Sequence, residues 1–389
     1  MQNLWDENEA KNYQSDLELR VYTSNLLGRS DEFVLHGGGN TSVKSVVDGE
    51  DILLVKGSGW DLVSIKAEGF APVKLKTLQE MATLESLSDS DMVTQQKSAM
   101  INSSAPNPSV EAILHAIIPY KFVDHTHADA VVTISNSING KEHIAKLFPN
   151  YLIIDYVMPG FILAQKIYEQ TQDFDWEACE GIILHNHGIF TFDDDAKASY
   201  DKMIDAVSHA EDFLRANALY GISKVRADAF DLETLQILMS RYKEYEVETH
   251  HNGSPLALYY ASLPVEKLYR GVLTPEHIIR TKRHPLVLKK GDDMQAKILE
   301  YIGEYEAYFE AFKRDEIMLN PAPNYAVIEG YGVVSFGKNE KEVTIINDII
   351  SHTMVAVLRA DMLGGYESIS LIDSFDMEYW ELEQAKLKK

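Results

Sequence analysis

The sequence predicts a layered α/β/α domain over residues 1–225, followed by a C-terminal α/β region over 226–389. Short apolar runs such as 52–55 and 181–184 have the length and composition of buried strands. Between such runs lie longer segments with apolar residues at helical spacing, at 16–28 and 194–218. Strands that alternate with helices are typical of a layered α/β fold.

The elements of the first region follow from local signals. The helix at 16–28 is expected to end at Gly28. The other expected elements, in order, are a strand at 33–35 and a strand at 52–55 that each open into a glycine-rich turn, a helix at 111–118 ended by Pro119, a strand that carries His125 and His127, and a strand at 181–184 that leads through 188–192 into the helix at 194–218.

The C-terminal region contains a helical pattern at 230–246, a polar break at 250–255 that predicts a loop, and then a second αβ segment. Residues 331–363 resemble 187–219 in their apolar pattern and share a glycine, Gly332 for Gly188, which a tight turn of the backbone would explain. If this is a decayed second copy, Tyr331 takes the place of His187 and the copy binds no metal. If not, the C-terminal region is an unrelated addition.

Composition excludes several classes of partner. The chain has 36 basic and 60 acidic residues, a net charge of −24, which repels nucleic-acid phosphates and anionic lipid. Cys179 is the only cysteine, so neither an intrachain disulfide nor a thiolate zinc site is available. The first residues lack the features of a signal peptide, and no apolar run approaches about 20 residues. We therefore expect a cytoplasmic protein that binds neither nucleic acid nor membrane.

Three histidines and one glutamate predict a metal centre. His125 and His127 are two apart on a predicted strand and therefore leave it from the same face, and His187 follows a second strand. Three imidazoles leave one position of a Zn²⁺ ion open, as catalytic sites do, and Glu111 at the start of a helix supplies an acid/base. His115 and His185 could orient a ligand or simply pack in the core, and the sequence leaves both alternatives open.

Small polar residues in turns predict an anion site. Asn40, Thr41, Ser58, Gly59 and Ser109 each lie in a glycine-rich turn or just before a helix, where hydroxyls and backbone N–H groups bind phosphate. Neither glycine-rich stretch matches a Walker loop or a dinucleotide fingerprint. Next to a metal and a carboxylate, such turns predict a small sugar phosphate as the substrate.

These motifs together resemble those of the class II aldolase/adducin family. The resemblance is carried, in order, by His-Gly-Gly-Gly-Asn-Thr-Ser at 36–42, Lys-Gly-Ser-Gly-Trp at 56–60, Pro-Ser-Val-Glu at 108–111, His-Thr-His-Ala-Asp at 125–129 and His-Gly at 187–188. Within the family, the chain is most similar to the aldolase half of bifunctional rhamnulose-1-phosphate aldolase/short-chain dehydrogenase proteins. Residues 375–386 resemble the segment that precedes the dehydrogenase half, and that half is absent here.

The resemblance implies a role for each site residue. His125, His127 and His187 would bind Zn²⁺, and Glu111 would be the acid/base. Asn40, Ser58, Gly59 and Ser109 would hold a phosphate. Tyr156 would be lent to a neighbouring subunit as a proton donor, which implies a homo-oligomer, by resemblance a tetramer. Val110 departs from the family pattern, because related short aldolases have a serine there.

The implied reaction is retro-aldol cleavage of a ketose 1-phosphate, of the rhamnulose 1-phosphate type, to dihydroxyacetone phosphate and an aldehyde. A sugar-phosphate 4-epimerase or a dehydratase on the same scaffold is an alternative, although epimerases of this family typically carry aspartate where this chain has Glu111. A non-catalytic adducin-like binding protein is a further alternative, against which the three histidines count.

Overall fold

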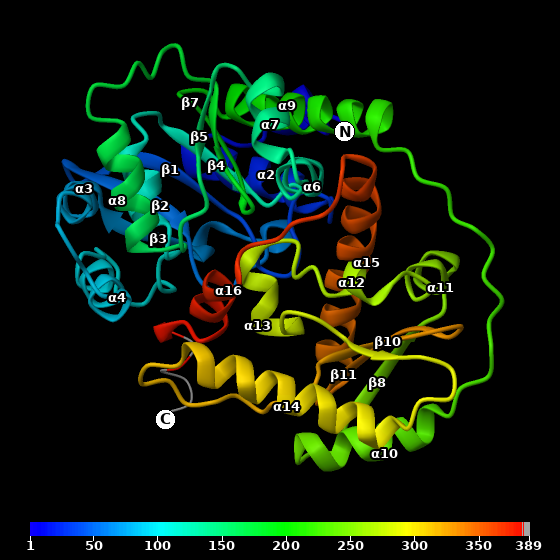
Figure 1. Ribbon diagram of the computed structural model, residues 1–389. Helices are drawn as coiled ribbons and strands as arrows, with labels where there is room; N and C mark the ends of the chain where they lie inside the picture. Colours follow the sequence, from blue (N-terminus) through cyan, green and yellow to red (C-terminus); the bar gives the residue numbers. More distant parts are fainter. Residues whose placement is uncertain (383, 385–389) are drawn as a thin grey trace. The chain divides into compact units, whose positions relative to one another are not determined.

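The computed structural model describes residues 1–382 and 384, and it divides the chain into two compact units (Figure 1). The first unit comprises residues 1–135 and 140–215. The second comprises 136–139 and the described residues from 216 onward. Each unit has its own sheet and its own apolar core. Of the tail segment at 375–386, residues 383, 385 and 386 lie outside the described part.

The sheet of the first unit has seven strands in the order β3-β2-β1-β4-β7-β6-β5. Only β5 and β6 pair in parallel, and the other neighbours are antiparallel. The strands are β1 (Asn40–Val47), β2 (Glu50–Lys56), β3 (Phe70–Lys74), β4 (Phe122–Thr126), β5 (Tyr151–Ile154), β6 (Gly181–Leu184) and β7 (Gly188–Asp193).

Helices cover both faces of this sheet, which confirms the predicted layered architecture. Helices α2 and α9 contribute side chains to one face, and α3, α5 and α8 pack together on the other. The helices are α1 (Glu7–Ala10), α2 (Asp16–Gly28), α3 (Leu75–Ala82), α4 (Asp89–Ser98), α5 (Ala112–Ile117), α6 (Asp129–Ser135), α7 (Gly140–Leu147), α8 (Phe161–Gln170) and α9 (Ala196–Asn217), with short 3₁₀ turns at Leu62–Ser64 and Ala67–Gly69.

Helix α2 illustrates how local signals set the bounds of an element. Its first turn is closed by a capping box between Ser15 and Glu18, in which each side chain bonds to the other residue's backbone N–H. Its last residue, Gly28, meets the backbone of Val63, and a Cβ at Gly28 would lie 2.1 Å from the Val63 nitrogen. The predicted helix at 16–28 is therefore confirmed at both ends.

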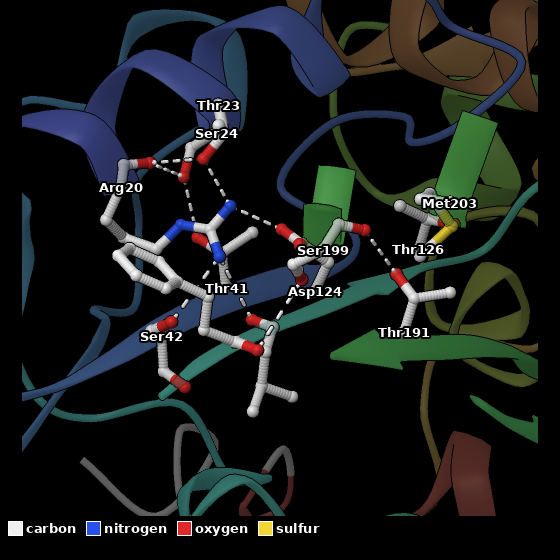
Figure 2. Close-up of polar contacts among 12 residues, drawn as sticks. Arg20, Thr23, Ser24, Thr41, Ser42, Asp124, Thr126, Thr191, Ser199 and Met203 are labelled. Atoms are coloured by element: carbon white, nitrogen blue, oxygen red, sulfur yellow. Dashed lines mark hydrogen bonds and ion pairs between the residues drawn. The ribbon is translucent and has the colours of Figure 1, made fainter. Parts of the chain in front are cut away.

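A buried polar network lies under α2 and α9 (Figure 2). The guanidinium of Arg20 and the carboxylate of Asp124 form an ion pair in which both side chains are fully buried. Asp124 also accepts a hydrogen bond from Ser199 of α9. Arg20 reaches the carbonyl oxygens of Ser42 and Val123, each at 3.4 Å, and so bridges the paired strands β1 and β4. This network ties both helices to the strand that carries His125.

The second unit contains a four-stranded sheet in the order β8-β11-β10-β9, in which only β9 and β10 pair in parallel. Its strands are β8 (Glu248–Asn252), β9 (Leu286–Leu288), β10 (Tyr325–Ile328) and β11 (Gly332–Gly337). Its helices are α10 (Leu232–Lys243), α11 (Pro255–Tyr260), α12 (Val265–Leu268), α13 (Ile278–Thr281), α14 (Met294–Phe312), α15 (Glu340–Met362) and α16 (Leu371–Glu378), with a 3₁₀ turn at Pro275–His277.

Among the described helices, α15 alone is long and apolar enough to cross a membrane. Within it, 61% of the apolar window is buried inside the protein. Burial of this kind is what a core helix of an α/β unit requires, so length and composition do not make α15 a membrane span.

Two predicted elements are wrong. Residues 33–35 form no strand, because the chain turns there and the strand begins only at Asn40, after His36, Gly37 and Gly39 have adopted positive φ. The predicted loop at 250–255 is in its first half the strand β8, because His250 to Asn252 pair with β11. At 250–252 tertiary pairing overrides local composition, and at 33–35 the apolar run is taken up by the turn that precedes β1.

The two sheets repeat one topology. In the first unit β4, β7, β6 and β5 are neighbours in that spatial order, as β8, β11, β10 and β9 are in the second. The two sets also have the same strand directions, and their members follow one another along the chain in the same succession. In both units the last strand leads into a long helix, α9 or α15. A duplication predicts this shared topology. The shared topology also extends beyond the short segment that is similar in sequence.

Candidate metal centre

The three predicted histidines meet at one corner of the first sheet. His125 lies on β4, His127 follows the end of β4, and His187 lies in the turn between β6 and β7. One ring nitrogen from each histidine lies within 4.8 Å of those of the other two. The Nε2 atoms of His125 and His127 are 3.1 Å apart. Bonds of about 2.0–2.1 Å to a tetrahedral Zn²⁺ place ligand nitrogens about 3.3 Å apart. One pair of nitrogens is close to this spacing, and the triad as a whole is somewhat wider.

The β6–β7 turn that presents His187 depends on two neighbouring residues. Asn186 adopts φ of 59°, a left-handed conformation that asparagine tolerates well, and its N–H donates to Ser135. A Cβ on Gly188 would lie 2.4 Å from the carbonyl oxygen of Thr126. Gly188 is therefore needed because β7 passes close to β4, rather than for the tight turn that the sequence suggested.

The surroundings of His125 determine which of its two ring nitrogens can bind a metal. His125 Nδ1 donates to the carbonyl oxygen of Ile189 at 3.0 Å, which leaves Nε2 with the lone pair that binds a metal. The ring stacks on Phe190, with 4.0 Å between centroids. The contact with Ile189 thus fixes both the tautomer and the ring plane, as is usual for a metal-binding histidine.

Glu111 is the residue that precedes helix α5, and its side chain makes no capping hydrogen bond but faces the histidines. Its Oε2 lies 3.5 Å from His125 Nε2, and its Oε1 lies 3.8 Å from His187 Nε2. Glu111 is 5% exposed, and its Oε1 has no hydrogen-bond partner among the described residues. A buried carboxylate oxygen in that state, beside three imidazoles, fits a site that holds a divalent cation and its substrate.

A chain of buried polar groups stands behind Glu111. Asn40 Nδ2 donates to Glu111 Oε2 at 2.6 Å, and the Asn40 side-chain oxygen, Oδ1, contacts His115 Nε2. Ser42 Oγ lies 2.8 Å from His115 Nδ1. Burial holds the pKa of His115 well below its usual range, and the nearby His125, Lys44 and Arg20 lower it further. The structure thus gives His115, for which the sequence left two roles open, a place behind the site.

The predicted anion-binding turns lie side by side, but part of their donor capacity is used. Ser58 N donates to Asn107 O at 2.8 Å, and Ser109 N donates to Lys56 O at 3.0 Å. Ser109 Oγ accepts the N–H of Glu111. Ser58 and Gly59 are exposed, and the space beside Gly59 is open. Val110, the departure from the family pattern, packs against the apolar core.

The structure does not bring Thr41 to this site. Thr41 alternates with Asn40 and Ser42 on β1, so its side chain leaves the opposite face of the sheet. There its hydroxyl lies 2.8 Å from Ser24 Oγ, within the network under α2 (Figure 2). The side chain of Thr41 therefore does not reach the histidine triad. The sequence did not reveal this, because the face that a strand residue takes depends on where β1 begins.

Tyr156 and His185 lie towards the other edge of the sheet. Tyr156 follows β5, which is separated from β4 by β6 and β7, and it is half-buried. Its expected role concerns a neighbouring subunit and stays a prediction. Burial lowers the pKa of His185 to about 4, and its charged neighbours are Lys141 and Asp155.

Lys56 is a residue of this region that the sequence did not single out. It is 6% exposed, and its Nζ donates to Gly37 O at 2.9 Å. Burial lowers its pKa to about 8, while Asp61 and Glu111 act in the opposite direction. Its place in Lys-Gly-Ser-Gly, at the end of a buried strand, was the available signal.

Comparison with known proteins identifies the family. A family model of the Class II Aldolase and Adducin N-terminal domain matches residues 18–213, just over half of the chain. The chain belongs to the class II aldolase and adducin family. A second family model, described as Aldolase class II, second domain, matches residues 228–387. The two matches cover most of the two units that the structure separates.

Two known proteins are similar to this chain. The chain is 29% identical over 426 residues to the "Uncharacterized oxidoreductase YuxG" of Bacillus subtilis (strain 168), and it spans 60% of the length of that relative. The N-terminal class II aldolase domain of a conserved protein from Thermoplasma acidophilum is 40% identical, with a TM-score of 0.51. That similarity covers 55% of this chain and all of the solved domain.

Proposed function

We propose that this protein is a metal-dependent carbon–carbon lyase that cleaves a ketose 1-phosphate to dihydroxyacetone phosphate and an aldehyde. The observation that carries the proposal is the buried Glu111 carboxylate, 3.5 and 3.8 Å from two histidines of a triad that fits Zn²⁺. Family membership supports the same chemistry. Within the class, the sequence resemblance favours rhamnulose 1-phosphate.

His125, His127 and His187 would hold the ion, which when bound supplies a Lewis acid that polarises the substrate carbonyl. Cleavage breaks the C3–C4 bond and moves one proton, from the C4 hydroxyl to C3. Glu111 Oε1 faces His187 and accepts no hydrogen bond from the described residues, and it would deliver the proton at C3. Tyr156, contributed by a neighbouring copy of the chain in a homo-oligomer, is proposed to take the C4 hydroxyl proton. The exposed Ser58–Gly59 turn would bind the phosphate.

The experiment is to incubate the purified, zinc-loaded protein with a panel of ketose 1-phosphates, including rhamnulose 1-phosphate, and to measure released dihydroxyacetone phosphate. The matched variant is Glu111→Gln. It should keep the metal but lose turnover by about a hundred- to ten-thousandfold, because an amide cannot transfer the proton. Turnover of the variant within tenfold of wild type would remove Glu111 from the mechanism.

The same assay separates the alternatives. Epimerised sugar without released triose would identify a 4-epimerase, and loss of water from the substrate would identify a dehydratase. A protein that binds no divalent metal and turns over none of the panel would fit an adducin-like binding role instead.

A further inference from the structure

The polar groups behind Glu111 are arranged at matching intervals on two elements. Asn40 and Ser42 are two residues apart on β1, a separation of about 6.7 Å along a strand. Glu111 and His115 are four residues apart at the start of and within α5, a separation of about 6 Å along a helix. Because the two rows have the same spacing, each group on α5 meets a partner on β1.

The row continues beyond the site. Lys44, the next residue on the same face of β1, donates its Nζ to the carbonyl oxygen of His115 at 3.2 Å and to that of Tyr120 at 2.6 Å, and it also contacts the carbonyl of Ile118. These oxygens lie at and just beyond the C-terminal end of α5. Helix α5 is therefore joined to β1 along its whole length by polar contacts, with Glu111 at one end.

Chemistry gives this chain of contacts a direction. A neutral imidazole has one donor and one acceptor, and the burial that keeps His115 neutral leaves it no other form. Asn40 Nδ2 donates to Glu111 Oε2, so the other end of the same amide, Oδ1, faces His115 Nε2. His115 then donates from Nε2 to Asn40 and accepts at Nδ1 from Ser42.

We propose that Ser42, His115 and Asn40 form a directed hydrogen-bond chain that locks the Asn40 amide, so that it holds Glu111 Oε2 beside His125 and leaves Oε1 facing His187. His115 and Asn40 are then positioning residues, and Asn40 serves the carboxylate rather than only the phosphate expected from the sequence. All four side chains are at most 6% exposed, so water does not replace a missing partner. The inference rests on the proposed role of Glu111 for its functional consequence, but not for its structural content.

The structural content is tested by ¹⁵N NMR on the full-length protein labelled at histidine, with the His115→Gln spectrum used for assignment. The expected result is a neutral His115 ring protonated at Nε2 between pH 6 and 8. A ring protonated at Nδ1 alone would overturn the proposal, because Asn40 would then have to present its oxygen to Glu111. A ring protonated at both nitrogens would overturn the direction of the chain at its far end, because Nδ1 would then donate to Ser42 instead of accepting from it. This measurement requires neither metal nor substrate.

The functional content is tested with two substitutions at His115. His115→Leu removes donor and acceptor, and the expected result is a fall in kcat of about ten- to a hundredfold with KM and metal content unchanged, because only the aim of Glu111 is lost. His115→Gln retains one donor and one acceptor and should recover most of that loss. If both variants fold, as judged by their melting curves, and are equally impaired, His115 is only a packing residue.

A substitution at Ser42 and the exchange rate of the Asn40 side-chain amide test the chain independently of His115. Ser42→Ala removes only the far end of the chain, and it should lower kcat less than His115→Leu does. In protein labelled at asparagine, the Asn40 side-chain amide should exchange slowly in wild type and in His115→Gln, and faster in Ser42→Ala. An Asn40 amide that exchanges equally fast in all of them would contradict the locked amide. The expected tautomer in a protein without lyase activity would support the chain and reject the proposed function.

Discussion

The same backbone turn occurs in both sheets, at the corner of the first sheet that holds the histidine triad and at the matching corner of the second. In the first, the His187 N–H donates to Leu184 O at 3.1 Å. In the second, the Tyr331 N–H donates to Ile328 O at 3.0 Å. The middle residue of each turn is left-handed, Asn186 at φ 59° and Gly330 at 73°.

The glycine after each turn meets the same obstacle. A Cβ at Gly188 would lie 2.4 Å from the carbonyl oxygen of Thr126, and one at Gly332 would lie 2.3 Å from that of Asn252. Thr126 and Asn252 hold equivalent places in the two ladders, opposite Ile189 and Val333. The turn hydrogen bond, the left-handed residue and the glycine that follows are thus present in both units.

The side chains differ. The strand registers place His251 where the first unit has His125, and Gly253 and Tyr331 where it has His127 and His187. The ring of His251 stacks on Tyr331 with 3.9 Å between centroids, and its Nε2 lies 2.8 Å from the Tyr331 carbonyl oxygen. A single imidazole whose face and Nε2 are both in contact with an aromatic residue does not make a metal site. Close backbone packing maintains the scaffold, and a few side chains carry the chemistry.

The largest expected effect follows from this difference. His127→Ala should lose the bound metal and the activity while the fold survives, because the core of the first unit consists of apolar residues that pack without the ion. His251→Ala in the second unit is the matched control and should keep both. Metal content by elemental analysis and circular dichroism check the pair. Retention of stoichiometric metal by His127→Ala would exclude it as a ligand.

A smaller effect is expected from the two shared glycines. Gly188→Ala and Gly332→Ala each force a Cβ against a backbone carbonyl, at a cost of about 1–3 kcal/mol. Gly332→Ala should cost more, because Gly332 also has φ of 113°. Only Gly188→Ala should weaken metal binding, since its Cβ would also lie 3.0 Å from the His125 ring.

The control for the glycine pair is Gly303→Ala in helix α14. Gly303 has open space around its Cβ position, so this change should stabilise the protein by about 0.5–1 kcal/mol. Denaturant unfolding of all three variants gives the comparison. If Gly188→Ala and Gly303→Ala shift the unfolding midpoint alike, close approach is not the reason for Gly188.

The sequence predicted those features that depend on local pattern. The α2 bounds follow from a capping serine and a final glycine, and the meeting of His125 and His187 follows from their places beside strands. The pairing of His250 to Asn252 with β11 and the orientation of Thr41 toward Ser24 were missed. Both depend on which strand lies alongside, a long-range property that local composition does not encode.

The smallest expected effect compares one buried lysine in each unit, Lys44 and Lys243. Burial lowers the pKa of each to about 7, whereas an unfolded lysine titrates near 10.5. The unfolded chain therefore binds more protons between pH 7 and 10.5, and the free energy of unfolding rises with pH across that window. Well below pH 7 each lysine is charged in both states, and the destabilisation caused by its burial is complete.

The partners of the two lysines differ. Lys44 donates to three backbone carbonyls near the end of α5, whereas Lys243 donates to Asn324 Oδ1 at 2.7 Å. Lys243→Met should therefore stabilise the protein most at or below pH 7, with the gain shrinking toward pH 10. Lys44→Met should gain less at every pH, because methionine leaves those carbonyls without their donor. Urea unfolding at pH 6, 8 and 10 measures both, and a Lys243→Met profile parallel to wild type would show that Lys243 does not titrate in this window.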